Sequence, residues 1–241
     1  MEEPLRELAL FAGAGGGILG GHLLGWRTVC AVEINDYARR VLLARQRDDM
    51  LPRFPIWDDV TTFDGRPWRG RVDVISGGFP CQDISAAGKG AGITGARSGL
   101  WTHMARIIGE VRPHYVFVEN SPMLVSRGLD TVLSDLAAMG RNARWGVVGA
   151  QHAGAPHNRD RIWIWSEMAD AFGGSRKVSP RRGFKRMGRQ QQSIPWNESA
   201  ECALSRLRGM DDGMAGAVDR TDRIRNGQVP AVAALAWRLL S

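Results

Sequence analysis

The most constraining feature of the 241-residue sequence is the alternation of short apolar runs with amphipathic stretches through its first two thirds. Strands separated by helices of this length predict an α/β fold, with a mainly parallel sheet flanked by helices on both faces. Ligands of such sheets bind beyond the carboxyl ends of the strands. The apolar runs that we expect to form strands are residues 7–12, 28–33, 72–76, 115–119, 145–150 and 162–166. The expected helices are residues 18–24, 36–45, 100–111 and 129–139.

The alternation ends near residue 166. Residues 167–222 are rich in Gly, Arg, Gln and Ser and have weak periodicity, which indicates a small loop-rich insert. A mostly apolar helix is expected at residues 229–240, and it must pack against the sheet domain. We therefore expect a first domain at residues 1–166, an insert at 167–222, and a returning segment at 223–241.

The net charge of +7 is concentrated in the second part of the chain. Residues 151–241 carry 15 Lys and Arg against 9 Asp and Glu, whereas residues 1–150 carry 17 against 16. The run at residues 175–192 has seven basic residues and no acidic one, and it includes Arg181, Arg182, Lys185 and Arg186. Such a run is suited to a phosphate backbone, although a solvated loop is the alternative.

Composition also limits where the protein acts. No apolar stretch reaches the roughly 18 residues of a transmembrane helix, and the N-terminus lacks the layout of a signal peptide. The three cysteines, Cys30, Cys81 and Cys202, have no CxxC or metal-ligand spacing. We therefore expect a cytoplasmic protein without a disulfide framework, a metal ion or a membrane segment.

A glycine-rich turn, FAGAGGG at residues 11–17, follows the first expected strand. Glycines allow a sharp turn and a close approach of a ligand to the helix that follows. Glu33 ends the next strand about 20 residues on, where a carboxylate can accept hydrogen bonds from both hydroxyls of a ribose. Asp58 and Asp59 fall where a third strand should end and could accept a hydrogen bond from an adenine amino group. The alternatives are a charge at a helix N-terminus for Glu33 and an ordinary turn for the aspartates.

Two reactive side chains follow apolar strands. Cys81 lies in GGFPCQDIS, just past the strand at residues 72–76, and Glu119 ends the strand that reads YVFVEN. Because the carboxyl ends of neighbouring parallel strands share one edge, we expect the thiol and the carboxyl to converge there. Partial desolvation should raise the pKa of Glu119, which suits an acid. The alternatives are a small apolar residue in a turn and a carboxylate that caps a helix.

Arg159 and Arg161 lie two residues apart just before another strand, in HNRDRIWIW. In an extended chain they point to the same side, where one of them could hold a carbonyl or phosphate beside the thiol. Arginines on an exposed strand edge are the alternative.

The order of these segments, together with RSGLW at residues 97–101 and RNGQVP at 225–230, resembles the DNA cytosine-5 methyltransferases. The resemblance covers Leu8 to about Ser166 and resumes near Asn226. It implies a Rossmann-like class I methyltransferase fold. It also implies methyl transfer from S-adenosylmethionine to C5 of a cytosine flipped out of double-stranded DNA, as in restriction-modification systems.

The resemblance assigns roles residue by residue. Cys81 would attack cytosine C6, Glu119 would hydrogen-bond the base at N3, and Arg161 would hold O2 and steady the thiol. Glu33 would bind the cofactor ribose, and the rest of the cofactor site would comprise Phe11, Ala12, Gly15, Asp59, Val60, Pro80, Leu100 and Asn226. The implied DNA contacts, besides the basic run, are Gln82, Ser85, Lys89 and Arg159, of which the first three lie on a loop that would close over the site.

The sequence departs from the family pattern at three positions. Ala9 replaces an acidic or hydroxyl residue, His157 a glutamine and Arg225 a glycine. Two alternatives stay open: a tRNA cytosine-5 methyltransferase, against which Gln82 argues, and a catalytically silent DNA-binding relative, against which Cys81 and Glu119 argue. We expect a monomer that associates with the nucleoid when bound to DNA.

Overall fold

The computed structural model describes residues 3–80, 99–155, 157–169 and 227–241. The chain divides into one unit of Met1–Met168 with Arg223–Ser241 and a second unit, Ala169–Asp222. Apart from Ala169, the second unit lies outside the described residues. None of the described helices has the length and apolar character needed to cross a membrane.

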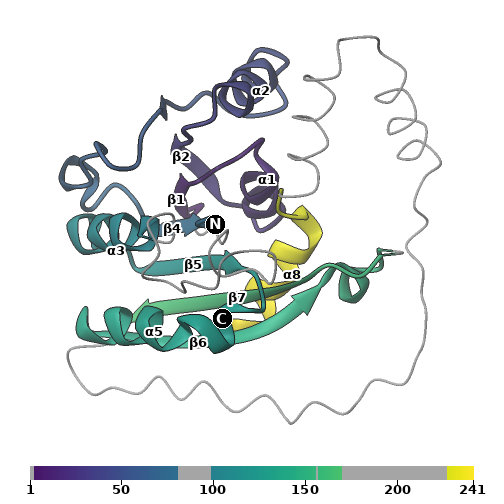
Figure 1. Cartoon of the computed structure of the whole chain (residues 1–241). Coiled ribbons are helices and arrows are strands. Elements are labelled where there is room, and N and C mark those ends of the chain that lie inside the picture. Colours follow the sequence, from purple (N-terminus) through teal and green to yellow (C-terminus); the bar gives the residue numbers. More distant parts are fainter. Residues whose placement is uncertain (1–2, 81–98, 156, 170–226) are drawn as a thin grey trace. The chain divides into compact units, whose positions relative to one another are not determined.

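The first unit is built on a seven-stranded sheet with the order β3-β2-β1-β4-β5-β7-β6 (Figure 1). Neighbours from β3 to β5 are parallel, whereas β7 is antiparallel to both β5 and β6. The mainly parallel α/β sheet that the sequence predicts is therefore confirmed. The strands are β1 (Arg6–Leu10), β2 (Arg27–Val32), β3 (Ile56–Trp57), β4 (Val74–Gly77), β5 (Tyr115–Asn120), β6 (Arg141–Gly149) and β7 (Asp160–Met168).

Each predicted helix is present with bounds that differ by at most a few residues. These helices are α1 (Gly16–Leu23), α2 (Asp36–Arg47), α3 (Leu100–Val111), α5 (Leu129–Ala138) and α8 (Pro230–Leu240). The short helix α4 (Leu124–Arg127) and two 3-10 turns, η1 (Arg66–Trp68) and η3 (Ala150–Ala153), were not predicted from the sequence.

The alternation of side chains along each strand divides the core between the two faces of the sheet. On one face Leu8, Val116 and Ile162 belong to a cluster that includes residues of α3 and α5. On the other face Phe117 and Trp163 pack with residues of α8, and their rings stack at 5.1 Å. Both faces are covered, as a parallel sheet with apolar side chains on both sides requires.

The C-terminal helix α8 is anchored between α1 and the strands (Figure 1). The ring of Trp237 lies 4.6 Å from Trp26 and 5.4 Å from Phe117. A Cβ added to Gly20 would lie only 2.7 Å from the Cβ of Ala233, so the two helices approach as closely as a glycine permits. The glycines of α1 therefore serve the packing of α8, which the sequence analysis did not foresee.

One carboxyl lies wholly inside the sheet. Glu7 of β1 is 0% exposed and accepts hydrogen bonds from Thr28 Oγ1 at 2.6 Å and Ser76 Oγ at 2.5 Å. Burial raises its pKa from 4.5 to about 7, against the effect of the two hydroxyls.

Candidate functional site

An ion pair between Glu119 and Arg161 lies at the carboxyl end of β5. Glu119 is opposite Trp163 in the antiparallel pairing with β7, and Arg161 Nε lies 2.7 Å from Glu119 Oε1. Because β7 runs antiparallel, its first residues meet the last residues of β5. Arg161 therefore reaches the edge formed by the carboxyl ends of the parallel strands from the amino end of β7. It lies within β7, whereas the sequence prediction placed it just before the strand.

The carboxyl of Glu119 is largely shielded from water, with 8% of the residue exposed. Burial raises its pKa, while the charges of Arg161 and Arg159 and a hydrogen bond from Gln228 oppose this shift. The direction agrees with the sequence prediction of a partly desolvated acid. Glu119, Arg159, Arg161 and Gln228 line one cleft, together with Trp163, Val229 and Val232.

The backbone that leads to residue 81 passes directly beside Glu119. Asn120 Nδ2 donates to the carbonyl of Phe79 at 3.2 Å. A Cβ added to Gly78 would lie 2.6 Å from Glu119 Oε2, so the chain passes Glu119 at a distance that only glycine allows. Cys81 itself lies outside the described residues, but the chain approaches it from a position adjacent to the carboxyl.

Arg159 is half-buried and joins this cleft to the C-terminal segment. Its Nη2 donates to the carbonyl of Gly227 at 2.7 Å, and burial lowers its pKa. In this structure Arg159 holds a carbonyl of its own chain, and the DNA contact expected for it stays a prediction. The neighbouring His157, one of the departures from the family pattern, is exposed.

The glycine turn forms the second part of the site, at the ends of β1 and β2. The amide of Gly13 donates to Glu33 Oε2 at 2.7 Å, and the amide of Asn35 donates to Oε1 at 2.8 Å. A Cβ added to Gly13 would have no atom within 4 Å, so the turn is open at this residue. Phe11 has a φ of 52°, a left-handed backbone conformation that is uncommon outside glycine.

Gly15 of the turn has a different role from Gly13. It is buried, and a Cβ on it would lie 2.9 Å from a side-chain carbon of Leu42. It therefore packs the turn against α2, while the open space lies at Gly13.

Two exposed apolar side chains lie beside Glu33. Ile34 is 71% and Trp57 47% exposed, and the amide of Glu33 donates to the Trp57 carbonyl at 2.9 Å. A carboxylate beside an open glycine turn, flanked by apolar side chains, fits a ligand with a ribose and a planar base. The predicted cofactor residues Phe11, Ala12 and Glu33 are thus brought together at this edge of the sheet.

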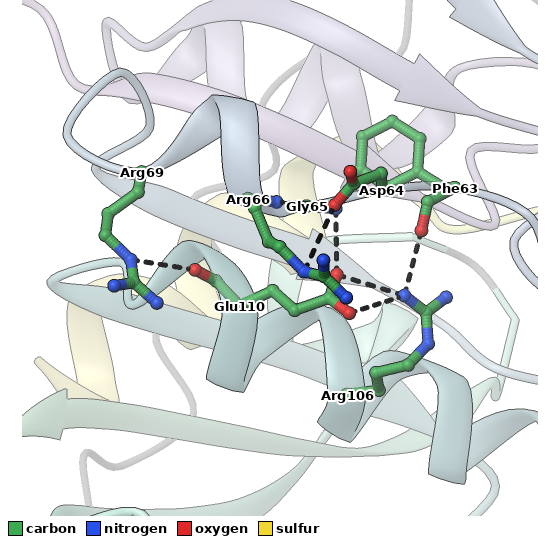
Figure 2. Close-up of polar contacts among 7 residues, drawn as sticks. All are labelled: Phe63, Asp64, Gly65, Arg66, Arg69, Arg106 and Glu110. Atoms are coloured by element: carbon green, nitrogen blue, oxygen red, sulfur yellow. Dashed lines mark hydrogen bonds and ion pairs between the residues drawn. The ribbon is translucent and has the colours of Figure 1, made fainter.

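The loop with Asp59 and Val60 is held by α3. Arg106 donates to the carbonyl of Phe63 at 2.9 Å, as Figure 2 shows, and to the carbonyl of Val60 at 3.0 Å. Glu110, one turn further along α3, pairs with Arg106 at 2.9 Å and accepts from the amide of Gly65 at 2.8 Å. The carboxylate of Asp59 accepts a hydrogen bond from the amide of Thr61 in the same loop, and this bond lowers the pKa of Asp59.

Sequence reasoning missed Gln228 and Arg106. Gln228 contacts the turn at Gly17 and hydrogen-bonds to Glu119 more than 100 residues away, so no local pattern predicts it. Arg106 and Glu110 are four residues apart on α3, a spacing that predicts an ion pair. The same spacing is also common on solvent-exposed helix faces, so it does not by itself indicate a contact with the loop.

The remaining predicted residues stay as predictions. Pro80 and Leu100 are partly buried at the two ends of a segment that the structure does not describe. The predicted site residues outside the described part of the chain are Cys81, Gln82, Ser85, Lys89, Arg181, Arg182, Lys185, Arg186 and Asn226.

Comparison with known proteins gives one consistent family. The model of a family described as C-5 cytosine-specific DNA methylase matches residues 5–181. The chain is 36% identical over 158 residues to the type II methyltransferase M.CviJI of Paramecium bursaria Chlorella virus IL3A, covering 65% of this chain and 41% of that protein. It is 33% identical over 176 residues to the type II methyltransferase M.Eco47II of Escherichia coli, covering 69% and 40%.

Solved structures show the same fold. The S. pombe Dnmt2 methyltransferase superposes with a TM-score of 0.57 at 19% identity, covering 69% of this chain and 50% of that one. The Entamoeba histolytica methyltransferase EhMeth superposes with a TM-score of 0.59 at 14% identity, covering 70% and 54%. The chain spans about two fifths of the length of the curated relatives it matches.

Proposed function

Because the chain belongs to the C-5 cytosine-specific DNA methylase family, we propose that it transfers a methyl group from S-adenosylmethionine to C5 of a cytosine flipped out of duplex DNA. The observation that carries the proposal is the ion pair of the buried Glu119 with the partly exposed Arg161, 2.7 Å apart, beside the backbone that leads to Cys81. A carboxyl and a guanidinium held in one cleft match the ring nitrogen and the carbonyl on one edge of a cytosine.

Cys81 acts as the nucleophile in this proposal. Its thiolate adds to C6 of the cytosine and makes C5 electron-rich enough to accept a methyl group. Loss of the C5 proton and departure of the thiolate then restore the aromatic ring. Glu119 hydrogen-bonds N3 and favours the adduct, and Arg161 holds O2.

The cofactor would be held at the carboxyl ends of β1 and β2, beside the glycine turn. Glu33 would bind the ribose, the open turn at Gly13 would leave room for the amino-acid part, and the loop at Asp59 and Val60 would border the adenine. S-adenosylmethionine supplies the methyl group as a sulfonium that carbon nucleophiles can attack. The contacts of Glu33 with two backbone amides support this assignment, because they fix the carboxylate against the turn.

The basic insert would provide the DNA contacts. We assign residues 167–222 to target recognition and Arg181, Arg182, Lys185 and Arg186 to the phosphate backbone, because the run at 175–192 has no acidic residue. Replacing these four by Gln should weaken DNA binding and reduce the slope of log K against log salt by about three to four. An unchanged slope would mean that the run does not contact phosphates.

The proposal is tested by methyl transfer to duplex DNA with the purified chain. The wild type should incorporate methyl groups at cytosine, and bisulfite sequencing should place them in one sequence context. Cys81→Ser should abolish transfer and leave S-adenosylmethionine binding largely intact. Transfer to a tRNA but not to DNA would instead favour the alternative function, a tRNA cytosine-5 methyltransferase.

Cys30→Ser is a matched control. Cys30 is 2% exposed, and burial raises the pKa of its thiol to about 12, so it is not a nucleophile near neutral pH. Transfer should survive in this variant. Equal activity of wild type and Cys81→Ser would refute the role assigned to Cys81.

A further inference from the structure

Gln228 lies two residues before α8, and its side-chain amide lies between Glu119 and the glycine turn. A Cβ added to Gly78 would lie 3.1 Å from Gln228 Nε2 and 2.6 Å from Glu119 Oε2. The nitrogen of the amide and the second carboxyl oxygen therefore converge on the glycine that leads towards residue 81. The first carboxyl oxygen, Oε1, is already held by Arg161.

The other end of the amide faces the glycine turn. A Cβ added to Gly17 would collide with Gln228 Oε1, so the oxygen rests on the start of α1. Because the oxygen points to Gly17, the NH₂ group is the end that faces Glu119, and an NH₂ group can donate to a carboxyl oxygen. The arrangement therefore presents the donor of Gln228 to Glu119.

The backbone at Gln228 is fixed from two directions. A Cβ added to Gly16 would collide with the carbonyl oxygen of Gln228, so α1 admits this segment only because it lacks side chains there. The preceding residue, Gly227, accepts a hydrogen bond from Arg159 at 2.7 Å. Because the main chain is held on both sides, the side-chain amide of Gln228 starts from a fixed position between Gly17 and Glu119.

We propose that Gln228 is a positioning residue, which holds the carboxyl of Glu119 in the orientation that meets the target base. Arg161 restrains one oxygen of the carboxyl and Gln228 the other, so the group cannot rotate away from the cleft. The inference rests on the proposed function, because it takes Glu119 as the group that binds cytosine N3. Hydrogen bonding by Gln228 also lowers the pKa of Glu119, which links the residue to the pH dependence of the reaction.

Two substitutions test the proposal. Gln228→Leu removes the donor and keeps most of the volume, so we expect a roughly tenfold lower kcat and less than about a threefold change in the KM for S-adenosylmethionine. Because the pKa of Glu119 should rise, the limb of the pH profile that reports this group should move to higher pH. Gln228→Glu is isosteric and places a second carboxyl against Glu119, so its activity should fall at high pH and recover as the pH is lowered.

The charged groups that face Glu119 among the described residues, Arg159 and Arg161, are unchanged in both variants. Arg238→Leu, on the exposed side of α8, is the control for the docking of the helix and should keep the wild-type pH profile. A loss of kcat in the Gln228 variants without any movement of the pH profile would overturn the proposal, because it would indicate a purely structural role.

A readout that does not need turnover separates this proposal from the proposed function. The carboxyl carbon of Glu119 can be followed by NMR titration of protein labelled at glutamate, with Glu119→Gln to assign the signal. A higher titration midpoint in Gln228→Leu supports the positioning role even if the wild type transfers no methyl group, a result that would refute the proposed function alone. An unchanged midpoint refutes the positioning role whatever the activity.

Discussion

Replacing the buried Glu7 by glutamine should make the protein more stable above neutral pH. Glu7 is 0% exposed, and its pKa is raised from 4.5 to about 7. Below pH 4.5 the carboxyl is protonated in both the folded and the unfolded chain, so it adds no pH dependence. Between pH 4.5 and 7 the unfolded chain loses the proton while the folded chain keeps it, and stability falls as the pH rises.

The size of the effect follows from the shift. A rise of the pKa from 4.5 to about 7 corresponds to about 3 kcal/mol of unfolding free energy, fully lost above pH 7. Glu7→Gln stays neutral at every pH and avoids this loss. Its amide still accepts a hydrogen bond from Thr28 or Ser76, and the other hydroxyl can turn to accept from the amide NH₂.

The assay is unfolding by urea at pH 5, 6, 7 and 8, followed by tryptophan fluorescence. The difference in unfolding free energy between Glu7→Gln and wild type should move by up to about 3 kcal/mol in favour of the variant between pH 5 and pH 8. Glu3→Gln, which changes an exposed carboxyl, should give no such trend. A difference that stays constant with pH would refute the assignment of Glu7 as a buried, nearly neutral acid.

Three further substitutions test the contacts that support the site. Gly16→Ala should lower the melting temperature and the activity together, because the new methyl group collides with the carbonyl of Gln228; a variant that matches wild type in both would contradict this contact. Arg106→Gln should raise the KM for S-adenosylmethionine about tenfold with DNA affinity unchanged, because the bordering loop loses its two carbonyl contacts. Arg69→Gln is the matched control, since its Nε contacts only the end of α3, and equal KM values in the two variants would argue against the loop's role. Arg141→Leu should destabilise the protein by about 2 kcal/mol in urea unfolding, because it leaves the buried carbonyl of Pro113 without its donor, and an unchanged unfolding midpoint would contradict this.

The parts of the fold that the sequence predicted are those set by local pattern. The bounds of α3 match the prediction at both ends, and the ends of β2 and β5 lie within one residue of it. The position of Glu119 at the carboxyl edge of the sheet could also be predicted, because it ends an apolar strand of a mainly parallel sheet.

The parts that it could not predict depend on long-range packing. Nothing local shows that β7 runs antiparallel, which is why Arg161 enters from the start of a strand. β3 has only two residues, too few for a periodic signal. The contacts of Gly16 and Gly20 with the C-terminal segment join residues more than 200 positions apart, so a glycine-rich turn suggested only a ligand site.

The central claim is that Cys81 bonds to C6 of a cytosine, and it is tested most directly by trapping that bond. A duplex that carries fluorine in place of hydrogen at the cytosine C5 cannot lose a proton there, so the adduct should persist after methyl transfer. We predict that the intact mass of the protein rises by that of the bound DNA strand and that peptide mapping locates the link at Cys81, with none in Cys81→Ser. Methylation of ordinary DNA with no link to the fluorinated strand, or a link at another residue, would contradict the account.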